Sequence, residues 1–196
     1  MTRLARPTLT VALVAAALAA CSRREPLPVL GTIPAFTLTS QADAPVTAES
    51  LRGRVWVANF IFTRCPTICP VLTQRMRQVR ERLPAGPDGV QAVSLSVDPA
   101  YDTPAVLRDY ASRHGAAGPD WTFLTGPREA IQSLLRDGFM VPFSDDGPPE
   151  QPITHGDRFV LVDRGLRIRG YYRGMEPEAL EQLVVDARAL AAEDAP

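Results

Sequence analysis

Two cysteines separated by three residues, Cys65 and Cys69, are the side chains in this sequence best suited to chemistry. On one turn of a helix their Cα atoms would lie roughly 6 Å apart. That separation permits a disulfide and also lets both sulfurs bind one ion. The unpaired N–H groups of a helix N-terminus stabilise thiolate relative to thiol. A pair at the start of a helix is therefore suited to metal binding and to thiol exchange.

Three uses of the cysteine pair stay open at this point. A purely structural disulfide is the weakest of them, because so short a loop restricts the unfolded chain least. A dithiol oxidoreductase usually has C-x-x-C spacing, but thiol exchange depends more on thiolate character and access than on motif length. The third use is a soft-metal site. Two thiolates select Cu(I) or zinc, and a divalent ion needs a further donor.

The sequence offers two histidines as that donor. His114 ends a predicted helix, where an exposed imidazole interacts favourably with the helix dipole, and we interpret it as structural. His155, in the segment I-T-H-G-D, lies in a predicted irregular loop immediately before a strand that starts at Arg158. In an α/β sheet whose closing hairpin lies beside the strand before the cysteines, this loop packs next to the cysteine loop. His155 is thus the candidate third ligand, although loops also host histidines that are merely solvated.

Two aspartates, Asp98 and Asp102, follow the end of another predicted strand in the segment S-V-D-P-A-Y-D. They would lie near the same edge of the sheet, where carboxylates could accept hydrogen bonds around the metal ligands or meet a partner protein. The alternative is local: Asp98 begins a turn, and Asp102 places a negative charge at a helix N-terminus.

The composition excludes several other classes of function. The chain of 196 residues has 21 basic and 22 acidic side chains, and every basic residue is arginine. Without lysine it has neither a lysine Schiff base nor a lysine-containing phosphate-binding loop. A net charge of -1 with no basic block argues against a nucleic-acid partner. Two His and three Cys are too few for multi-histidine zinc sites or a disulfide-dense scaffold.

Residues 1–20 are predicted to be a signal peptide, with two arginines followed by an apolar run from Leu9 to Ala20. This run is shorter than the roughly 20 residues that span a bilayer. The ending Leu18-Ala19-Ala20-Cys21 resembles the lipobox of bacterial lipoproteins, in which lipidated Cys21 becomes the first mature residue. Ordinary cleavage and an uncleaved anchor are the alternatives. The expected location is the bacterial cell envelope, on its periplasmic or extracytoplasmic face.

After a flexible tether over residues 21–34, residues 35–194 are expected to form one domain. Alternating or continuous apolar residues predict strands at Phe36–Thr39, Val46–Thr47, Arg54–Phe62, Ala92–Val97, Trp121–Leu124, Arg158–Asp163 and Leu166–Tyr172. Apolar residues at helical spacing predict four helices, which follow the cysteines, Thr103, Gly126 and Glu176. Central parallel strands linked by helices and closed by an antiparallel hairpin describe a thioredoxin-like α/β sandwich, with a central mixed sheet flanked by helices.

Several separate segments together carry a resemblance to a known family: F-T-L-T with L-R-G-R-V-W-V-A-N-F, F-T-R-C-P-T-I-C-P, S-V-D-P-A-Y-D-T-P, and the histidine before F-V-L-V-D. From about Phe36 to the terminal helix, the sequence resembles the SCO/SenC family of thioredoxin-like copper-binding proteins. The resemblance implies that Cys65, Cys69 and His155 bind copper. We expect the two thiolates to hold Cu(I), and the imidazole to extend the site to Cu(II).

The resemblance also implies a role in maturation of the copper A centre of cytochrome c oxidase. The protein would act as a metallochaperone that hands over copper, or as a thiol-disulfide oxidoreductase that reduces the cysteines receiving it. In the second case Cys65 and Cys69 form a disulfide when oxidised. The expected partners are the copper A-bearing subunit of the oxidase, another copper chaperone as a donor, and the membrane through the N-terminal anchor.

Overall fold

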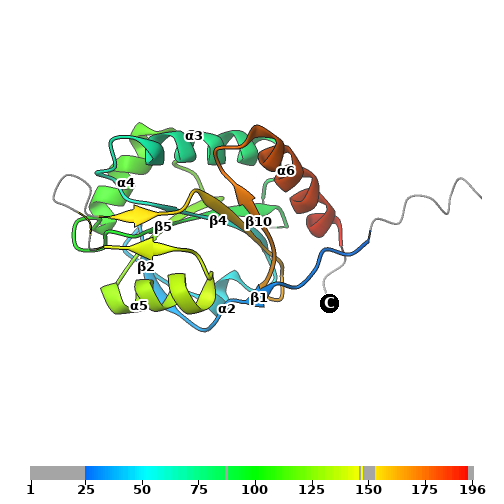
Figure 1. The fold of residues 1–196 in the computed structure, drawn as a ribbon, viewed down its shortest axis with the longest axis horizontal. Coiled ribbons are helices and arrows are strands. Elements are labelled where there is room, and N and C mark those ends of the chain that lie inside the picture. Colours follow the sequence, from blue (N-terminus) through cyan, green and yellow to red (C-terminus); the bar gives the residue numbers. More distant parts are fainter. Residues whose placement is uncertain (1–24, 87, 146, 148–152, 194–196) are drawn as a thin grey trace, which may run out of the picture.

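The computed structural model describes residues 25–86, 88–145, 147 and 153–193. The predicted signal peptide and the lipidation site Cys21 lie outside these residues. The chain forms an eight-stranded mixed sheet in the order β1-β10-β9-β4-β5-β6-β2-β3, with helices on both faces (Figure 1). The predicted thioredoxin-like sandwich is therefore confirmed.

Three parallel strands form the centre of the sheet: β4 (Val55–Ile61), β5 (Val90–Ser96) and β6 (Trp121–Thr125). Every residue of β4 and β5 is buried, as expected for near-continuous apolar strands covered on both faces. Ile61 pairs with Ser96 at the carboxyl ends of these strands. The connections that follow β4 and β5 therefore leave the sheet side by side, and they carry the cysteines and the two aspartates.

Antiparallel strands complete the sheet on both sides. The hairpin of β9 (Arg158–Val162) and β10 (Arg167–Arg173) joins the edge of β4. On the other side, β2 (Thr37–Ser40) and β3 (Pro45–Thr47) form a second hairpin, and β2 pairs with β6. The strands of both hairpins match those predicted at Phe36–Thr39, Val46–Thr47, Arg158–Asp163 and Leu166–Tyr172 within a few residues.

Three helices cover one face of the sheet: α3 (Ile68–Glu81), α4 (Pro104–Arg113) and α6 (Pro177–Ala192) (Figure 1). The short helix α2 (Ala48–Leu51) and α5 (Arg128–Ser133), which continues into a π-helical turn η2 (Leu134–Gly138), lie on the other. The apolar stripe of α3 packs into the core. In the described part of the chain, no helix is long and apolar enough to cross a membrane.

The segment predicted to be a flexible tether is partly built into the sheet. Gly31–Thr32 form strand β1, which pairs antiparallel with β10. The Leu30 N–H donates to the Ile168 carbonyl at 2.8 Å, and Ile33 is buried. The tether prediction is therefore wrong for residues 30–34. β1 forms because the outer edge of β10 offers backbone N–H and C=O groups for pairing. The composition of residues 21–34 does not reveal this distant partner.

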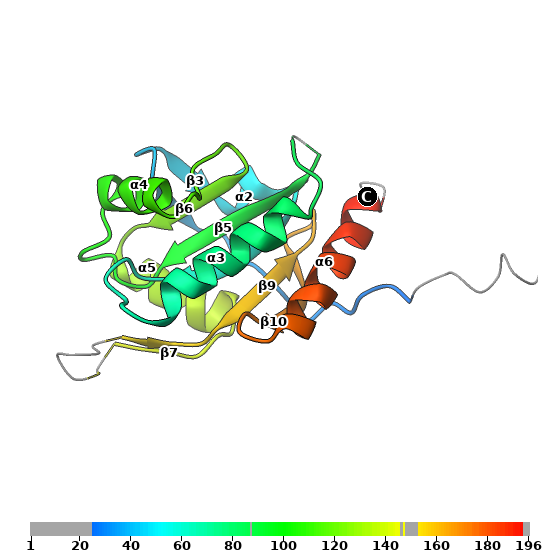
Figure 2. The same cartoon turned by 90° about the horizontal axis from the view of Figure 1, so that it is seen from above.

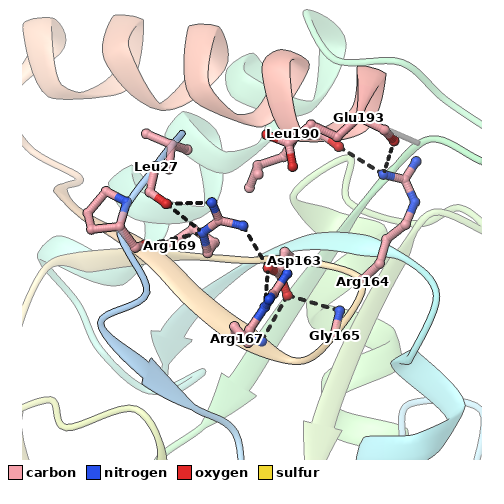
Figure 3. A network of polar contacts seen from close by, with 9 residues as sticks. Leu27, Asp163, Arg164, Gly165, Arg167, Arg169, Leu190 and Glu193 are labelled. Atoms are coloured by element: carbon pink, nitrogen blue, oxygen red, sulfur yellow. Dashed lines mark hydrogen bonds and ion pairs between the residues drawn. The ribbon is translucent and has the colours of Figure 1, made fainter. Parts of the chain in front are cut away.

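A buried polar network also fixes the N-terminal segment (Figure 3). The Arg169 guanidinium donates to the Leu27 and Pro28 carbonyls, and it pairs with Asp163 at 2.8 Å. Asp163 also accepts from the side chain of Arg167 at 2.8 Å. Burial would raise the pKa of Asp163, but the hydrogen bonds from the two arginines outweigh burial, and the pKa is lowered. Asp163 is thus held as a carboxylate anion whose charge is balanced by the two arginines.

The register of β9 shows where this network lies. Val162, next to Asp163, pairs with Trp56 near the amino end of β4. The cysteines follow the carboxyl end of the same strand, so the network and the cysteine loop lie at opposite ends of β4. The first described residues leave the body on the side opposite to that toward which β5 points (Figure 2).

Candidate metal centre

The connection between β4 and α3 holds the two cysteines in different environments. Cys65 lies in the loop, whereas Cys69 lies in the first turn of α3. The helix thus begins between them, and only Cys69 is helical. The residue at the N-cap, Thr67, makes no side-chain capping bond, and the Cys69 N–H instead donates to the Cys65 sulfur at 3.5 Å. The Cys65 sulfur therefore accepts one of the otherwise unpaired N–H groups of the helix start.

Both cysteines are free thiols in this structure, but they are not equivalent. Cys65 is 7% exposed and Cys69 is 0% exposed. Burial would raise the pKa of Cys65, but hydrogen bonds from the backbone N–H groups of Cys69 and Thr67 outweigh burial and lower it. Burial is also the main influence on Cys69, and it raises the pKa of that thiol. Cys65 is therefore the thiol that ionises first and the one nearer to solvent.

His155 approaches the cysteines from a different part of the chain. It lies in the short strand β8 (Thr154–His155), where it pairs with Phe143 of β7 (Phe143–Ser144). The sequence predicted an irregular loop here, and the short two-stranded ribbon was missed. In Figure 2, β7 extends from the body on the side to which β5 points. This ribbon brings His155 to the same end of the sheet as the cysteine loop.

The imidazole is oriented for use as a ligand. Its Nε2 atom lies 3.3 Å from the Cys69 sulfur, and its Nδ1 atom lies 2.9 Å from the Gly156 carbonyl oxygen. When Nδ1 donates its proton to Gly156, the lone pair of Nε2 faces the sulfur. Burial lowers the pKa of His155, which favours the neutral ring that binds metals. The edge of the Phe62 ring packs against it at 5.7 Å between centroids.

The three donor side chains are of types that suit copper, although they do not yet converge on one point. Two sulfurs and one imidazole are ligands that suit Cu(I) and Cu(II). Among the described residues, no three His, Cys, Asp or Glu side chains are already placed to hold an ion together. The direct contact joins Cys69 to His155, and the Cys65 sulfur is held against the Cys69 N–H. Binding of one ion by all three side chains therefore requires a side-chain rearrangement.

The two predicted aspartates bind the residues that precede Cys65. Asp98 Oδ2 accepts from Arg64 Nε at 3.0 Å, and the Arg64 guanidinium lies 4.5 Å from the Tyr101 ring centroid. Asp102 accepts from the Thr63 N–H at 3.1 Å and from the Thr63 hydroxyl at 2.5 Å. The aspartates thus link the β5–α4 connection to the cysteine loop. Asp98 also begins a turn, because its carbonyl accepts from the Tyr101 and Asp102 N–H groups.

Sequence reasoning missed Thr63, Arg64 and two further residues that support the site. The Thr73 hydroxyl donates to the Cys69 carbonyl at 2.9 Å and lies 2.8 Å from the Tyr110 hydroxyl. A signal for Thr73 was present, since a polar side chain four residues after Cys69 falls on the buried stripe of the helix. His114 is the C-cap of α4, and its ring lies against the Tyr110 ring at 4.2 Å between centroids and an interplanar angle of 37°, as expected for a structural histidine.

Comparison with known proteins places this geometry in a family. The SCO1/SenC model matches residues 28–190. A SCO1/SenC family lipoprotein from Bacillus anthracis str. Ames is 32% identical with a TM-score of 0.74, covering 86% of this chain and 98% of that one. BsSco, described as a cytochrome c oxidase assembly protein with a disulfide switch, is 30% identical with a TM-score of 0.74, covering 87% and 100%.

One related structure was solved with a metal ligand in place. Bradyrhizobium japonicum ScoI, solved with copper bound, is 25% identical with a TM-score of 0.64, covering 82% of this chain and 99% of that one. Sco family proteins are involved in copper binding and cytochrome c oxidase assembly. Because the family model spans most of the sequence and these relatives share its fold, the chain belongs to the SCO1/SenC family.

Proposed function

We propose that the protein is a copper metallochaperone for the copper A centre of cytochrome c oxidase, and that Cys65, Cys69 and His155 bind its cargo. The observation that carries this proposal is the approach of His155 Nε2 to the Cys69 sulfur at 3.3 Å. These residues are 86 positions apart, and the fold brings them together at the end of the sheet where the cysteine loop lies. A thiol and an imidazole in contact form part of a site for a soft ion.

The three side chains have separate tasks in this proposal. The Cys65 thiolate forms first and is nearer to solvent than Cys69, so it is the first of the two sulfurs to meet incoming copper. Cys69 then loses its proton to the solvent as its sulfur binds, because a thiol must be deprotonated to act as a ligand. His155 supplies Nε2, while Gly156 holds Nδ1 and fixes the ring. Two thiolates satisfy Cu(I), and the imidazole completes the site for Cu(II).

Release to a partner follows from the small number of ligands. A closed four-ligand cage would retain the metal, whereas a three-ligand site near the surface leaves room for a donor atom from the partner. The cysteines of the partner replace Cys65 and Cys69 one at a time, and copper passes across by ligand exchange. An upstream copper chaperone would load the site by the reverse exchange.

Thiol reduction is the second candidate function, and the difference between the two thiols favours it. The lowered pKa of Cys65 suits attack on a disulfide of the partner, which gives a mixed disulfide and releases one thiolate. Cys69 then attacks Cys65, so the partner gains two electrons and two protons and this chain forms the Cys65–Cys69 disulfide. The contact of the Cys69 N–H with the Cys65 sulfur keeps the two residues close.

The N-terminus completes the proposal for location. We infer a signal segment over residues 1–20 and a lipid on Cys21, which would hold the protein at the outer face of the bacterial cytoplasmic membrane or elsewhere in the envelope. The lipobox-like ending supports this inference, as does the description of the Bacillus anthracis relative as a lipoprotein. The described chain starts near the end of the sheet opposite to the cysteines. The anchor would therefore leave the copper site accessible to a membrane-bound partner.

Transfer and reduction are separated by offering the same partner in two states. The soluble copper A domain of the oxidase is presented either reduced and metal-free or with its cysteines as a disulfide. A metallochaperone loaded with copper builds the copper A absorption in the reduced domain. The copper-free dithiol protein should leave the oxidised domain unreduced. Fast reduction of the disulfide without copper transfer would instead establish the oxidoreductase function.

A further inference from the structure

Asp102 is a buried carboxylate that forms no ion pair within the part of the chain that the structure describes. Its side chain is 0% exposed, and it accepts hydrogen bonds from the Thr63 N–H, the Thr63 hydroxyl and the Ser96 hydroxyl, the last at 2.6 Å. All three donors are neutral. Across residues 25–86, 88–145, 147 and 153–193, no arginine forms an ion pair with Asp102, whereas its neighbour Asp98 pairs with Arg64.

A buried charge of this kind is costly. Buried carboxylates are usually paired with a cation, because water no longer stabilises the charge. Burial accordingly raises the pKa of Asp102, and hydrogen bonds from Ser96 and Thr63 oppose that effect. Neutral donors hold the carboxylate in place without an ion pair. Arg64 also attracts Asp102, but it forms its ion pair with Asp98. The fold therefore keeps a buried carboxylate at this position with no ion pair of its own among the described residues.

That position is beneath the cysteine loop. Thr63, which donates two of the hydrogen bonds, lies two residues before Cys65. Ser96, the other donor, ends β5 opposite Ile61, the last residue of β4. Through Thr63, the Asp102 carboxylate is hydrogen-bonded to the loop that carries Cys65. A cation bound at the cysteines would lie in the field of this carboxylate.

We propose that the Asp102 carboxylate is the counter-charge for bound copper and favours Cu(II) over Cu(I). This inference deepens the proposed function and rests on it. Two thiolates and a neutral imidazole give the site no net charge with Cu(II) and one negative charge with Cu(I). A fixed anion nearby destabilises the more negative state more strongly. Asp102 is thus a positioning residue for the loop that also sets the redox preference of the site.

The test is the one-electron reduction potential of copper in the wild-type protein and in the Asp102→Asn variant. The amide keeps the size of the side chain and removes its charge. We expect Cu(II) affinity to fall relative to Cu(I) affinity by on the order of tenfold. For one electron, a tenfold change raises the potential by about 59 mV. Circular dichroism of the copper-free chains verifies folding, and Asp102→Ser replaces the amide variant if that chain does not fold.

Two matched variants separate charge from position. Thr63→Val removes one hydrogen bond to Asp102 but keeps the charge, and it should leave the potential near the wild-type value. Asp102→Glu keeps the charge and should do the same. The proposal is overturned if Asp102→Asn leaves the potential unchanged or if Thr63→Val shifts it equally. Absence of copper binding by the wild-type protein would overturn the proposed function as well, which distinguishes the two failures.

Discussion

Two buried aspartates lie near opposite ends of the sheet and are treated in opposite ways. Asp163, beside the amino end of β4, is paired with Arg167 and with buried Arg169, and its pKa is lowered. Asp102, beyond the carboxyl end of β5, is held by hydroxyl and N–H groups, and its pKa is raised mainly by burial. Arginine ion pairs compensate Asp163, whereas Asp102 forms no ion pair among the described residues.

The Asp163 network contains its own cations, whereas the Asp102 network can accept one from outside the protein. Arg169 joins Asp163 to the N-terminal segment, and the neighbouring residue Arg164 donates to the Leu190 and Glu193 carbonyls at the end of α6 (Figure 3). The Asp163 network needs no further charge. The Asp102 network secures the cysteine loop and leaves a negative field for a cation. Substitutions at the two ends of the sheet and a pH series test this difference between the two networks.

The largest effect on stability should come from Arg169→Leu. This change leaves Asp163 with Arg167 alone and removes the donors to the Leu27 and Pro28 carbonyls. Breaking a buried ion pair in this way should lower the free energy of unfolding by about 3 kcal/mol. Urea denaturation of the reduced, metal-free protein measures it.

Arg167→Gln is the matched control for this change. Arg167 is 47% exposed, so solvent screens its pairing with Asp163 and the loss should stay below about 1 kcal/mol. Equal losses in the two variants would contradict the role of Arg169 as the buried partner of Asp163. Copper binding should be unchanged in both, since this network lies far along β4 from the cysteines.

Asp102→Ala, near the opposite end of the sheet, should lower the free energy of unfolding by less than Arg169→Leu does. Alanine leaves the Thr63 N–H and the hydroxyls of Thr63 and Ser96 without their acceptor. Unsatisfied buried donors cost about 1–3 kcal/mol, and removal of a buried charge offsets part of that cost. Denaturation midpoints check this, with Asp102→Asn as the control that should lose less. A larger loss than in Arg169→Leu would reverse the ranking of the two networks.

The smallest effect is a pH dependence of opposite sign for the two aspartates. The folded pKa of Asp163 is lowered, so its contribution to stability is present above the unfolded pKa of about 3.9 and is lost as pH falls through the folded pKa. The folded pKa of Asp102 is raised, so stability falls as pH rises from about 3.9 through that folded pKa. Unfolding free energies between pH 3 and pH 7 for Asp163→Asn and Asp102→Asn, each subtracted from wild type, should give slopes of opposite sign. Slopes of the same sign would contradict the comparison.

Many of the helices and strands could be predicted because the sequence patterns that indicate them are local. The strand β4 is a continuous apolar run, the stripe of α3 has helical spacing, and Thr103 with Pro104 marks the start of α4. The Thr103 hydroxyl indeed accepts from the Val106 N–H at 3.4 Å. By contrast, β1 and β8 each contain two residues and depend on distant pairing partners. No periodicity can reveal strands that short.

The sequence predicted the candidate metal ligands, but it did not predict most of the residues that hold them in place. The spacing of Cys65 and Cys69 and the family resemblance indicated the donors, but the helix start between the cysteines depends on the local backbone. The hydrogen bonds between Asp102 and Thr63 join residues 39 positions apart, so the sequence pattern could place Asp102 near the site without identifying Thr63. Charge compensation is likewise a property of the folded arrangement.

The most direct test of the proposed copper site is a copper titration of the reduced soluble chain beginning at Ser22, which keeps β1 in place. The wild-type protein should bind one Cu(II) ion per chain and show a thiolate charge-transfer band. Cys65→Ser, Cys69→Ser and His155→Ala should each lose this signal, whereas His114→Ala, the control at the other histidine, should keep it. Binding by His155→Ala that matches wild type would contradict the three-ligand copper site.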